Sequence, residues 1–246
     1  MGHWVTNNVE AYVSKLYGNF DRVLAPSQIM ADKLIGLGVQ NVFVQPLGVD
    51  LHTFHPDARD PDLRAQLGID EQTHLLIFAG RGSKEKNLPM LLDCMKHLGR
   101  RYHLLLVGSS MPAAVPDNVT VIDDFLPATQ VARLMASADA LLHAGDQETF
   151  GLVTLEAMAC GIAVVAVAAG AFSELITQDC GLLCEPNDAL AMANTVQDLF
   201  ASGSVDLGRQ ARRHVEQHYC WDTVVHSLLG HYHAVLGSQW PLVANG

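Results

Sequence analysis

The hydrophobic residues of the chain fall into two alternating kinds of segment. Short apolar runs bounded by Gly, Pro or charged residues predict buried strands at Leu75–Ala79, Leu104–Val107, Val119–Ile122, Ala138–Leu142, Ile162–Val167 and Gly181–Cys184. Between them, apolar residues spaced three or four positions apart predict helices, as in the stretch from Leu88 to Leu98. Strands that alternate with helices indicate a parallel sheet with helices on both faces. We therefore expect an α/β, Rossmann-like fold.

The two ends of the chain have a different pattern. Near the amino terminus the spacing predicts helices up to Phe20 and at Ser27–Gly36, each followed by a short strand, Val23–Ala25 and Val42–Val44. The segment Pro46–Asp50 interrupts this pattern, and from Asp188 onward three helices are expected, the last opening at Trp221. These breaks predict three regions: residues 1–48, 49–220 and 221–246.

Composition narrows the class of protein. The chain has 246 residues, almost half of them hydrophobic, and a formal net charge of −11, which argues against a nucleic-acid-binding surface. It contains no apolar run long enough to span a membrane, and its start does not resemble a signal peptide. We expect a cytosolic protein, with or without contact to a membrane face. The five cysteines are expected to be reduced, because their number is odd and no zinc-like double pair is present.

Two loops carry the candidate chemistry, and each directly follows a predicted strand. Gly80–Asn87 is glycine-rich and contains the cations Arg81 and Lys86, which suits a phosphate group, although the spacing is not that of a Walker loop. The second loop contains Glu148. Because open parallel sheets bind ligands beyond the carboxyl ends of their strands, both loops are expected at one rim of the sheet.

Glu148 and Glu156 flank the start of a predicted helix near Gly151. Free backbone N–H groups at a helix start suit a phosphate, and a carboxylate on either side can bind hydroxyls. Glu156 lies on a helix that is apolar nearly all round, where a charged side chain is rare without a partner or ligand. The arrangement favours a ligand made of ribose, diphosphate and sugar.

These residues resemble a known family. The segment Glu148–Glu156, followed by Ala157–Gly161, is similar to glycosyltransferase family 4, the retaining transferases of GT-B architecture. Further stretches agree with the family in the same order: Ala25-Pro26-Ser27, Pro46–Asp50, Gly80-Arg81 with Glu85-Lys86-Asn87, and Trp221 at the start of the last helix. One departure is His143-Ala144-Gly145, where the family usually has Pro-Ser.

The resemblance implies a role for each site residue. Arg81 and Lys86 would neutralise the donor diphosphate as the leaving group departs, and Glu148 would hold hydroxyls of the transferred sugar. The backbone of Phe150, Gly151 and Leu152 would contact sugar and phosphate, and Glu156 would bind the ribose. The donor would be a UDP-, GDP- or ADP-linked sugar, and the acceptor a saccharide or lipid.

The resemblance also bears on completeness and on cofactors. A complete enzyme of this type has two Rossmann-like domains, and residues 1–48 look like a remnant of the first, acceptor-binding domain with its linker. The chain is therefore expected to supply the donor-binding part of a hexosyltransferase and to transfer poorly without an amino-terminal acceptor domain.

No metal or other cofactor is expected, since Asp60-Pro61-Asp62 matches a metal-binding pattern but suits the cap of a short helix, with Pro61 as its first residue. Two alternatives remain open: a GT-B nucleotide-sugar epimerase, and a non-catalytic nucleotide-sugar-binding half of a split enzyme.

Overall fold

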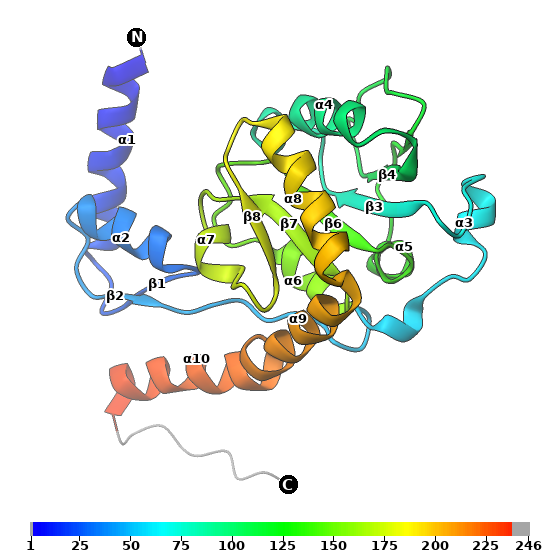
Figure 1. The fold of residues 1–246 in the computed structure, drawn as a ribbon. Coiled ribbons are helices and arrows are strands. Elements are labelled where there is room, and N and C mark those ends of the chain that lie inside the picture. Colours follow the sequence, from blue (N-terminus) through cyan, green and yellow to red (C-terminus); the bar gives the residue numbers. More distant parts are fainter. Residues whose placement is uncertain (1, 238–246) are drawn as a thin grey trace, which may run out of the picture. The chain divides into compact units, whose positions relative to one another are not determined.

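The protein divides into two compact units. A computed structural model describes residues 2–237, with side chains from Glu10 onward. One unit takes the chain up to Gly48 and resumes at Trp221, and the other spans Val49–Cys220. Figure 1 shows the element order of both units. No helix in the described range is long and apolar enough to cross a membrane.

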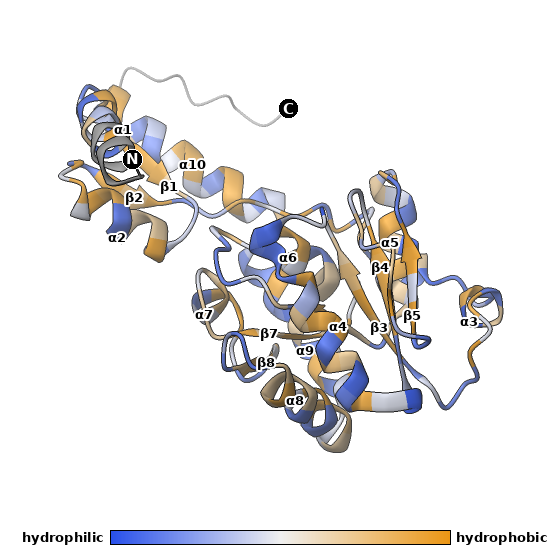
Figure 2. Cartoon of the chain, turned by 90° about the horizontal axis from the view of Figure 1, so that it is seen from above, coloured by the Kyte–Doolittle hydropathy of each residue, from blue (hydrophilic) through white to orange (hydrophobic). Residues whose placement is uncertain are grey.

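The larger unit is built on a six-stranded parallel sheet with strand order β5-β4-β3-β6-β7-β8. Its strands are β3 (His74–Ala79), β4 (Tyr102–Val107), β5 (Val119–Ile122), β6 (Ala140–His143), β7 (Ala163–Val167) and β8 (Gly181–Cys184). In register, Ile77 of β3 lies between Leu105 of β4 and Leu141 of β6. All three side chains are fully buried, and Figure 2 shows hydrophobic colouring along β3 and β4. The predicted parallel α/β sheet is confirmed.

Helices cover both faces of this sheet. The helices of the unit are α3 (Leu63–Gln66), α4 (Leu88–Leu98), α5 (Ala128–Ser137), α6 (Leu152–Ala159), α7 (Phe172–Leu175), α8 (Ala189–Ser202) and α9 (Ser204–His218), with short 3-10 turns at Pro56–Ala58, Lys84–Lys86 and Gly99–Arg101. α4 packs against α8, whereas α5 packs against α6. α4 lies on the opposite face from α5 and α6 because right-handed crossovers place a helix on one face when strands are added in one direction and on the other when the direction reverses (Figure 1). α8 follows the last strand and lies on the face of α4.

That reversal occurs between the two central strands. From β3 the chain moves outward to β4 and β5, and from β6 it moves the opposite way to β7 and β8. The loops that leave the carboxyl ends of β3 and β6 therefore diverge from each other. Such a switch point leaves a crevice at the rim of the sheet and is where open α/β sheets bind ligands.

The described part of the smaller unit contains a two-stranded parallel sheet and three helices. Its elements are α1 (Gly2–Tyr17), β1 (Val23–Ala25), α2 (Gln28–Gly36), β2 (Val42–Val44) and α10 (Trp221–Leu236). Gln45 connects the chain after β2 to α10, because its side-chain amide donates to the carbonyl of Val224 at 3.2 Å and accepts from the Ser227 hydroxyl at 3.0 Å. Gly48 packs directly on the indole of Trp221, where an added Cβ would lie 2.6 Å from ring carbon Cδ2.

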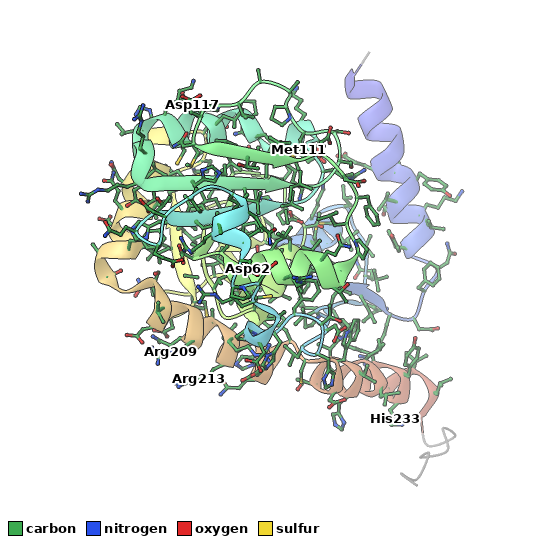
Figure 3. All side chains as sticks on the ribbon, turned by 90° about the vertical axis from the view of Figure 1, so that its right-hand side faces the viewer. Asp62, Met111, Asp117, Arg209, Arg213 and His233 are labelled. Carbon is green, nitrogen blue, oxygen red and sulfur yellow. The ribbon has the colours of Figure 1, made fainter. Side chains whose placement is uncertain are left out.

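The predicted cap at Asp60 and Pro61 is wrong. α3 begins only at Leu63 with Asp62 as its N-cap residue, and Figure 3 shows Asp62 at the surface. The Asp60 carboxylate is used differently: it accepts from the backbone N–H of Asp62 at 3.0 Å and pairs with Arg133 at 2.9 Å. The backbone N–H of Asp60 is in turn bonded to the hydroxyl of buried Ser137 at 2.8 Å. These contacts hold the segment in a turn ahead of the helix.

Candidate functional site

The loops after β3 and β4 interlock through glycines. The backbone N–H of Gly82 donates to the carbonyl of Ser109 at 2.8 Å, and a Cβ on Gly82 would lie 2.0 Å from the carbonyl oxygen of Ser110. A Cβ on Gly108 would come equally close to the carbonyl of Gly80. No side chain fits in either place, so the glycines allow the two backbones to touch. This contact holds Arg81 at the rim of the sheet.

A cavity of about 320 Å³ opens at this rim. Its wall is mostly apolar, with contributions from the ends of β3 and β4, from the segment after β5 and from α6. The lining residues are Ala79, Gly80, Arg81, Val107, Gly108, Ser109, Asp124, Phe125, Leu126, Val131, Leu152, Val153 and Glu156. Arg81 is exposed, and its guanidinium forms no hydrogen bond or ion pair with any described residue. A cation without a partner at the mouth of an apolar cavity suits an anionic ligand.

Glu156 contributes the carboxyl group of this cavity. It lies in the middle of α6, half-buried, and no described group donates a hydrogen bond to its carboxyl oxygens. Burial raises the pKa of Glu156 to about 7, because the apolar surroundings disfavour the charged form. A carboxyl group in this position can hydrogen-bond to the hydroxyls of a ligand that enters the cavity.

Lys86 and Glu148 form an ion pair close by. Lys86 Nζ lies 2.6 Å from Glu148 Oε2, and the two side chains are only 23% and 16% exposed. The pair forms because the 3-10 turn Lys84–Lys86 packs on Gly145, where a Cβ would lie 2.6 Å from the carbonyl of Glu85. Burial by itself raises the pKa of Glu148, but the hydrogen bond and charge of Lys86, with a hydrogen bond from the Gly151 backbone, hold it below its ordinary value.

The structure brings together the remaining residues expected at this rim. Leu152, 41% exposed, lines the cavity. Gly151 is the N-cap residue of α6 with a φ of 91°, a left-handed conformation that favours glycine. The side chain of Phe150 is buried and packs edge-on against Tyr219.

Two features of the site are missing from the sequence-based prediction. Phe125 lies at the wall of the cavity with 86% of its surface exposed, next to Asp124. Both residues follow β5, and their position after a predicted parallel strand is the signal that could have identified them. The second feature is His143, the last residue of β6, whose Nε2 lies 3.6 Å from Glu148 Oε2. Only its place in the unusual segment His143-Ala144-Gly145 marked it.

No metal site accompanies these residues within the part of the chain that is described. In that range no group of three or more His, Cys, Asp and Glu side chains is arranged to hold a metal ion. His214 and His218, four residues apart on α9, have their ring centroids 4.8 Å apart and their ring planes tilted by 51°. Cys94, Cys160, Cys180 and Cys184 are buried free thiols.

Comparison with known proteins finds a family model and relatives that the chain matches. Residues 59–216 match the model of the glycosyl transferases group 1 family. The chain is 33% identical over 230 residues to a GDP-mannose-dependent alpha-(1-6)-phosphatidylinositol dimannoside mannosyltransferase of Mycobacterium tuberculosis; the match covers 90% of this chain and 58% of that protein. The chain thus spans little more than half the length of this relative.

Solved structures resemble it in the same way. A sucrose-phosphate synthase from Thermosynechococcus elongatus superposes with a TM-score of 0.81 at 25% identity, over 94% of this chain and 62% of that one. The Anabaena protein HepE, solved in complex with UDP and glucose, superposes with a TM-score of 0.82 at 22% identity, over 92% of this chain and 67% of that one. The HepE match supports the fold alone.

Proposed function

Because the chain belongs to the glycosyl transferases group 1 family, we propose that it supplies the donor-binding part of a hexosyltransferase. In this proposal the donor is a nucleoside diphosphate sugar, and the sugar is transferred with retention of its anomeric configuration. One observation carries the proposal: a cation, Arg81, and a carboxyl group, Glu156, neither of which has a partner among the described residues, line the same cavity at the switch point of the sheet. The Lys86–Glu148 pair lies at the same rim.

The charges suggest how such a donor would bind. Arg81 and Lys86 would face the diphosphate and stabilise the negative charge that develops as the leaving group departs. The start of α6 would add backbone N–H groups to the same anion. Glu156 would accept from the ribose hydroxyls, and Glu148 from hydroxyls of the sugar, aided by the Phe150–Leu152 backbone. The apolar part of the cavity would take the nucleotide base.

The names of similar proteins leave the base open. The Mycobacterium tuberculosis relative is named for GDP-mannose, and HepE was solved with UDP and glucose. Exposed Phe125 beside the cavity can stack on either base, because stacking on an aromatic ring tolerates any base. A test of the proposal therefore has to compare several nucleotides.

The direct test is a thermal-shift panel of UDP, GDP and ADP and their glucose and mannose derivatives. We expect one base to raise the unfolding temperature of the wild-type chain and Glu156→Ala to lose most of that shift. No shift with any nucleotide would contradict donor binding. A shift that is unchanged in Glu156→Ala would contradict the ribose-binding role of Glu156.

Arg81 and Lys84 provide a matched pair in one loop. Both side chains are exposed cations, but only Arg81 lines the cavity. Arg81→Ala should weaken binding of the nucleoside diphosphate by about 10- to 100-fold, the usual range for a charge-assisted hydrogen bond to phosphate. Lys84→Ala should leave the dissociation constant measured by calorimetry unchanged. Equal losses in the two variants would mean that the loop attracts the nucleotide only through its net charge.

Donor binding without transfer is a second candidate function. It is favoured because every residue proposed to bind the donor lies in the single unit Val49–Cys220. The two functions differ in one measurement: a transferase releases the nucleoside diphosphate when a saccharide or lipid acceptor is supplied, whereas a binding protein does not.

Independence from metals and a cytosolic location are further predictions from the sequence. Nucleotide binding that is unchanged by EDTA would support the first. Cell fractionation would test the second.

A further inference from the structure

His143 is a polar residue buried at the edge of the proposed donor site. Its side chain is 1% exposed and packs against Phe78 and Phe172, with ring centroids 5.7 Å and 4.7 Å away. A buried imidazole needs a hydrogen-bond partner at each nitrogen. Nδ1 has one, since it lies 3.1 Å from the backbone N–H of Gly145. Nε2 has none among the described residues, and it lies 3.6 Å from Glu148 Oε2.

The hydrogen bond at Nδ1 determines where the ring carries its proton. Burial lowers the pKa of His143 to about 4, helped by the charge of Lys86 and opposed by Glu148, so the ring is neutral at pH 7. A neutral imidazole has one N–H, and Nδ1 must present its lone pair to the Gly145 N–H. The proton therefore lies on Nε2, which is the nitrogen next to the carboxylate of Glu148.

Lys86 and His143 approach the same oxygen of Glu148. Lys86 Nζ lies 2.6 Å from Oε2 and makes the strong contact, while His143 Nε2 lies 1.0 Å further away. A diphosphate in the crevice would attract Lys86 as well, because a lysine ammonium binds phosphate as a mobile point charge. A carboxylate that has to bind sugar hydroxyls would then lose its main orienting contact.

We propose that His143 is a positioning residue that holds the Glu148 carboxylate through its Nε2–H when Lys86 turns to the donor diphosphate. The inference rests on the proposed function. Unlike a second cation, a neutral N–H donor is not drawn away from Glu148 by the negative charge of the diphosphate. It also leaves lone pairs of the carboxylate free to accept from sugar hydroxyls.

The test compares two variants of the full chain. His143→Gln keeps an N–H donor near the position of Nε2, whereas His143→Leu fills similar space without one. Dissociation constants are measured by calorimetry for GDP, GDP-mannose, UDP and UDP-glucose. We expect His143→Leu to lose about tenfold in affinity for the nucleotide sugar relative to its nucleoside diphosphate, and His143→Gln to keep the wild-type ratio within about twofold.

Other outcomes separate the possibilities. A wild-type ratio in His143→Leu would overturn the positioning role while leaving donor binding intact. Equal losses of the ratio in both variants would also overturn it, because packing of the ring rather than the N–H would then matter. A wild-type chain that binds none of the four probes would instead overturn the proposed function and the inference that rests on it.

A second test is a measurement on the wild-type chain itself. Nitrogen-15 NMR of the imidazole, assigned by the loss of signals in His143→Gln or by site-specific labelling, reports which nitrogen is protonated. We expect the Nε2–H tautomer at pH 7. An Nδ1–H tautomer would overturn the proposal, because no hydrogen would then face Glu148.

Discussion

Glu148 and Glu156 lie eight positions apart, yet their surroundings shift their pKa values in opposite directions. Glu148 is held in its ionised form by Lys86 and the Gly151 backbone despite its burial. Glu156 has no such partner among the described residues, and burial alone raises its pKa to about 7. A carboxylate that already has a partner is held in one orientation. A buried carboxyl group without one gains most when a ligand supplies hydroxyls. This difference supports the separate roles proposed for them.

The raised pKa of Glu156 predicts a pH-dependent stability. Between about pH 4.5, its ordinary value, and pH 7 the folded protein keeps a proton that the unfolded chain releases. The free energy of unfolding contributed by this group therefore falls as pH rises through that window and stays level above it. Glu156→Gln removes the effect, so its free energy of unfolding relative to wild type should be greater at pH 8 than at pH 4.5, by on the order of 2 kcal/mol.

Urea denaturation of both proteins at several pH values measures this difference. All other titrating groups are shared by the two proteins, so they cancel to first order. A difference between variant and wild type that is the same at pH 4.5 and pH 8 would contradict the burial of the Glu156 carboxyl group.

At the scale of elements, the sequence predicted regular structure better than contacts. The predicted strands Val119–Ile122 and Gly181–Cys184 agree with the structure residue for residue, because short apolar runs between turn signals have the length of strands and not of helices. The cap at Asp60 was predicted wrongly: α3 begins only at Leu63, and one oxygen of the Asp60 carboxylate pairs with Arg133, which is distant in the chain. His143 was missed as a site residue for the same reason, since the packing around it involves Phe78 and Phe172 from other elements.

The interlocked loops after β3 and β4 predict the effect of a single methyl group. Gly82→Ala would place its Cβ 2.0 Å from the carbonyl oxygen of Ser110, which is backbone and cannot swing away. The two loops must separate, at a cost of about 3 kcal/mol in the free energy of unfolding, as for other overpacked or strained sites. Since the same loop carries Arg81, we also expect weaker nucleotide binding, measured by calorimetry on the folded variant.

Gly68→Ala is the control for this variant. Gly68 has a left-handed φ of 68° but nothing within 4 Å of an added Cβ, so only backbone strain acts there, on the order of 1 kcal/mol. It should leave nucleotide binding unchanged. A smaller loss of stability in Gly82→Ala than in Gly68→Ala would contradict the close contact between the two loops.

At the scale of the molecule, the proposed donor site and the main core belong to one unit. The buried cluster runs from Val49 to Val215, and all the candidate site residues lie within these limits. The ends of the unit are joined, because the backbone N–H of Val49 donates to the carbonyl of Tyr219 at 2.9 Å and Val49 forms a parallel bridge with Cys220. Gly48 and Trp221, on the other side of this junction, contact each other within the smaller unit.

This organisation predicts that residues 49–220 fold and bind the donor alone. A domain with its own hydrophobic core and joined ends can fold independently, so the truncated protein should unfold cooperatively in urea. Its dissociation constant for the nucleoside diphosphate should agree with that of the full chain within about twofold, since no described residue of the removed unit lines the cavity. Glu156→Ala in the truncated protein serves as the control and should weaken binding as it does in the full chain.

A folded truncation that binds more than about tenfold more weakly would mean that the smaller unit contributes to the donor site. In that case the boundaries predicted at residues 48 and 221 would separate two parts of one binding site rather than two independent units.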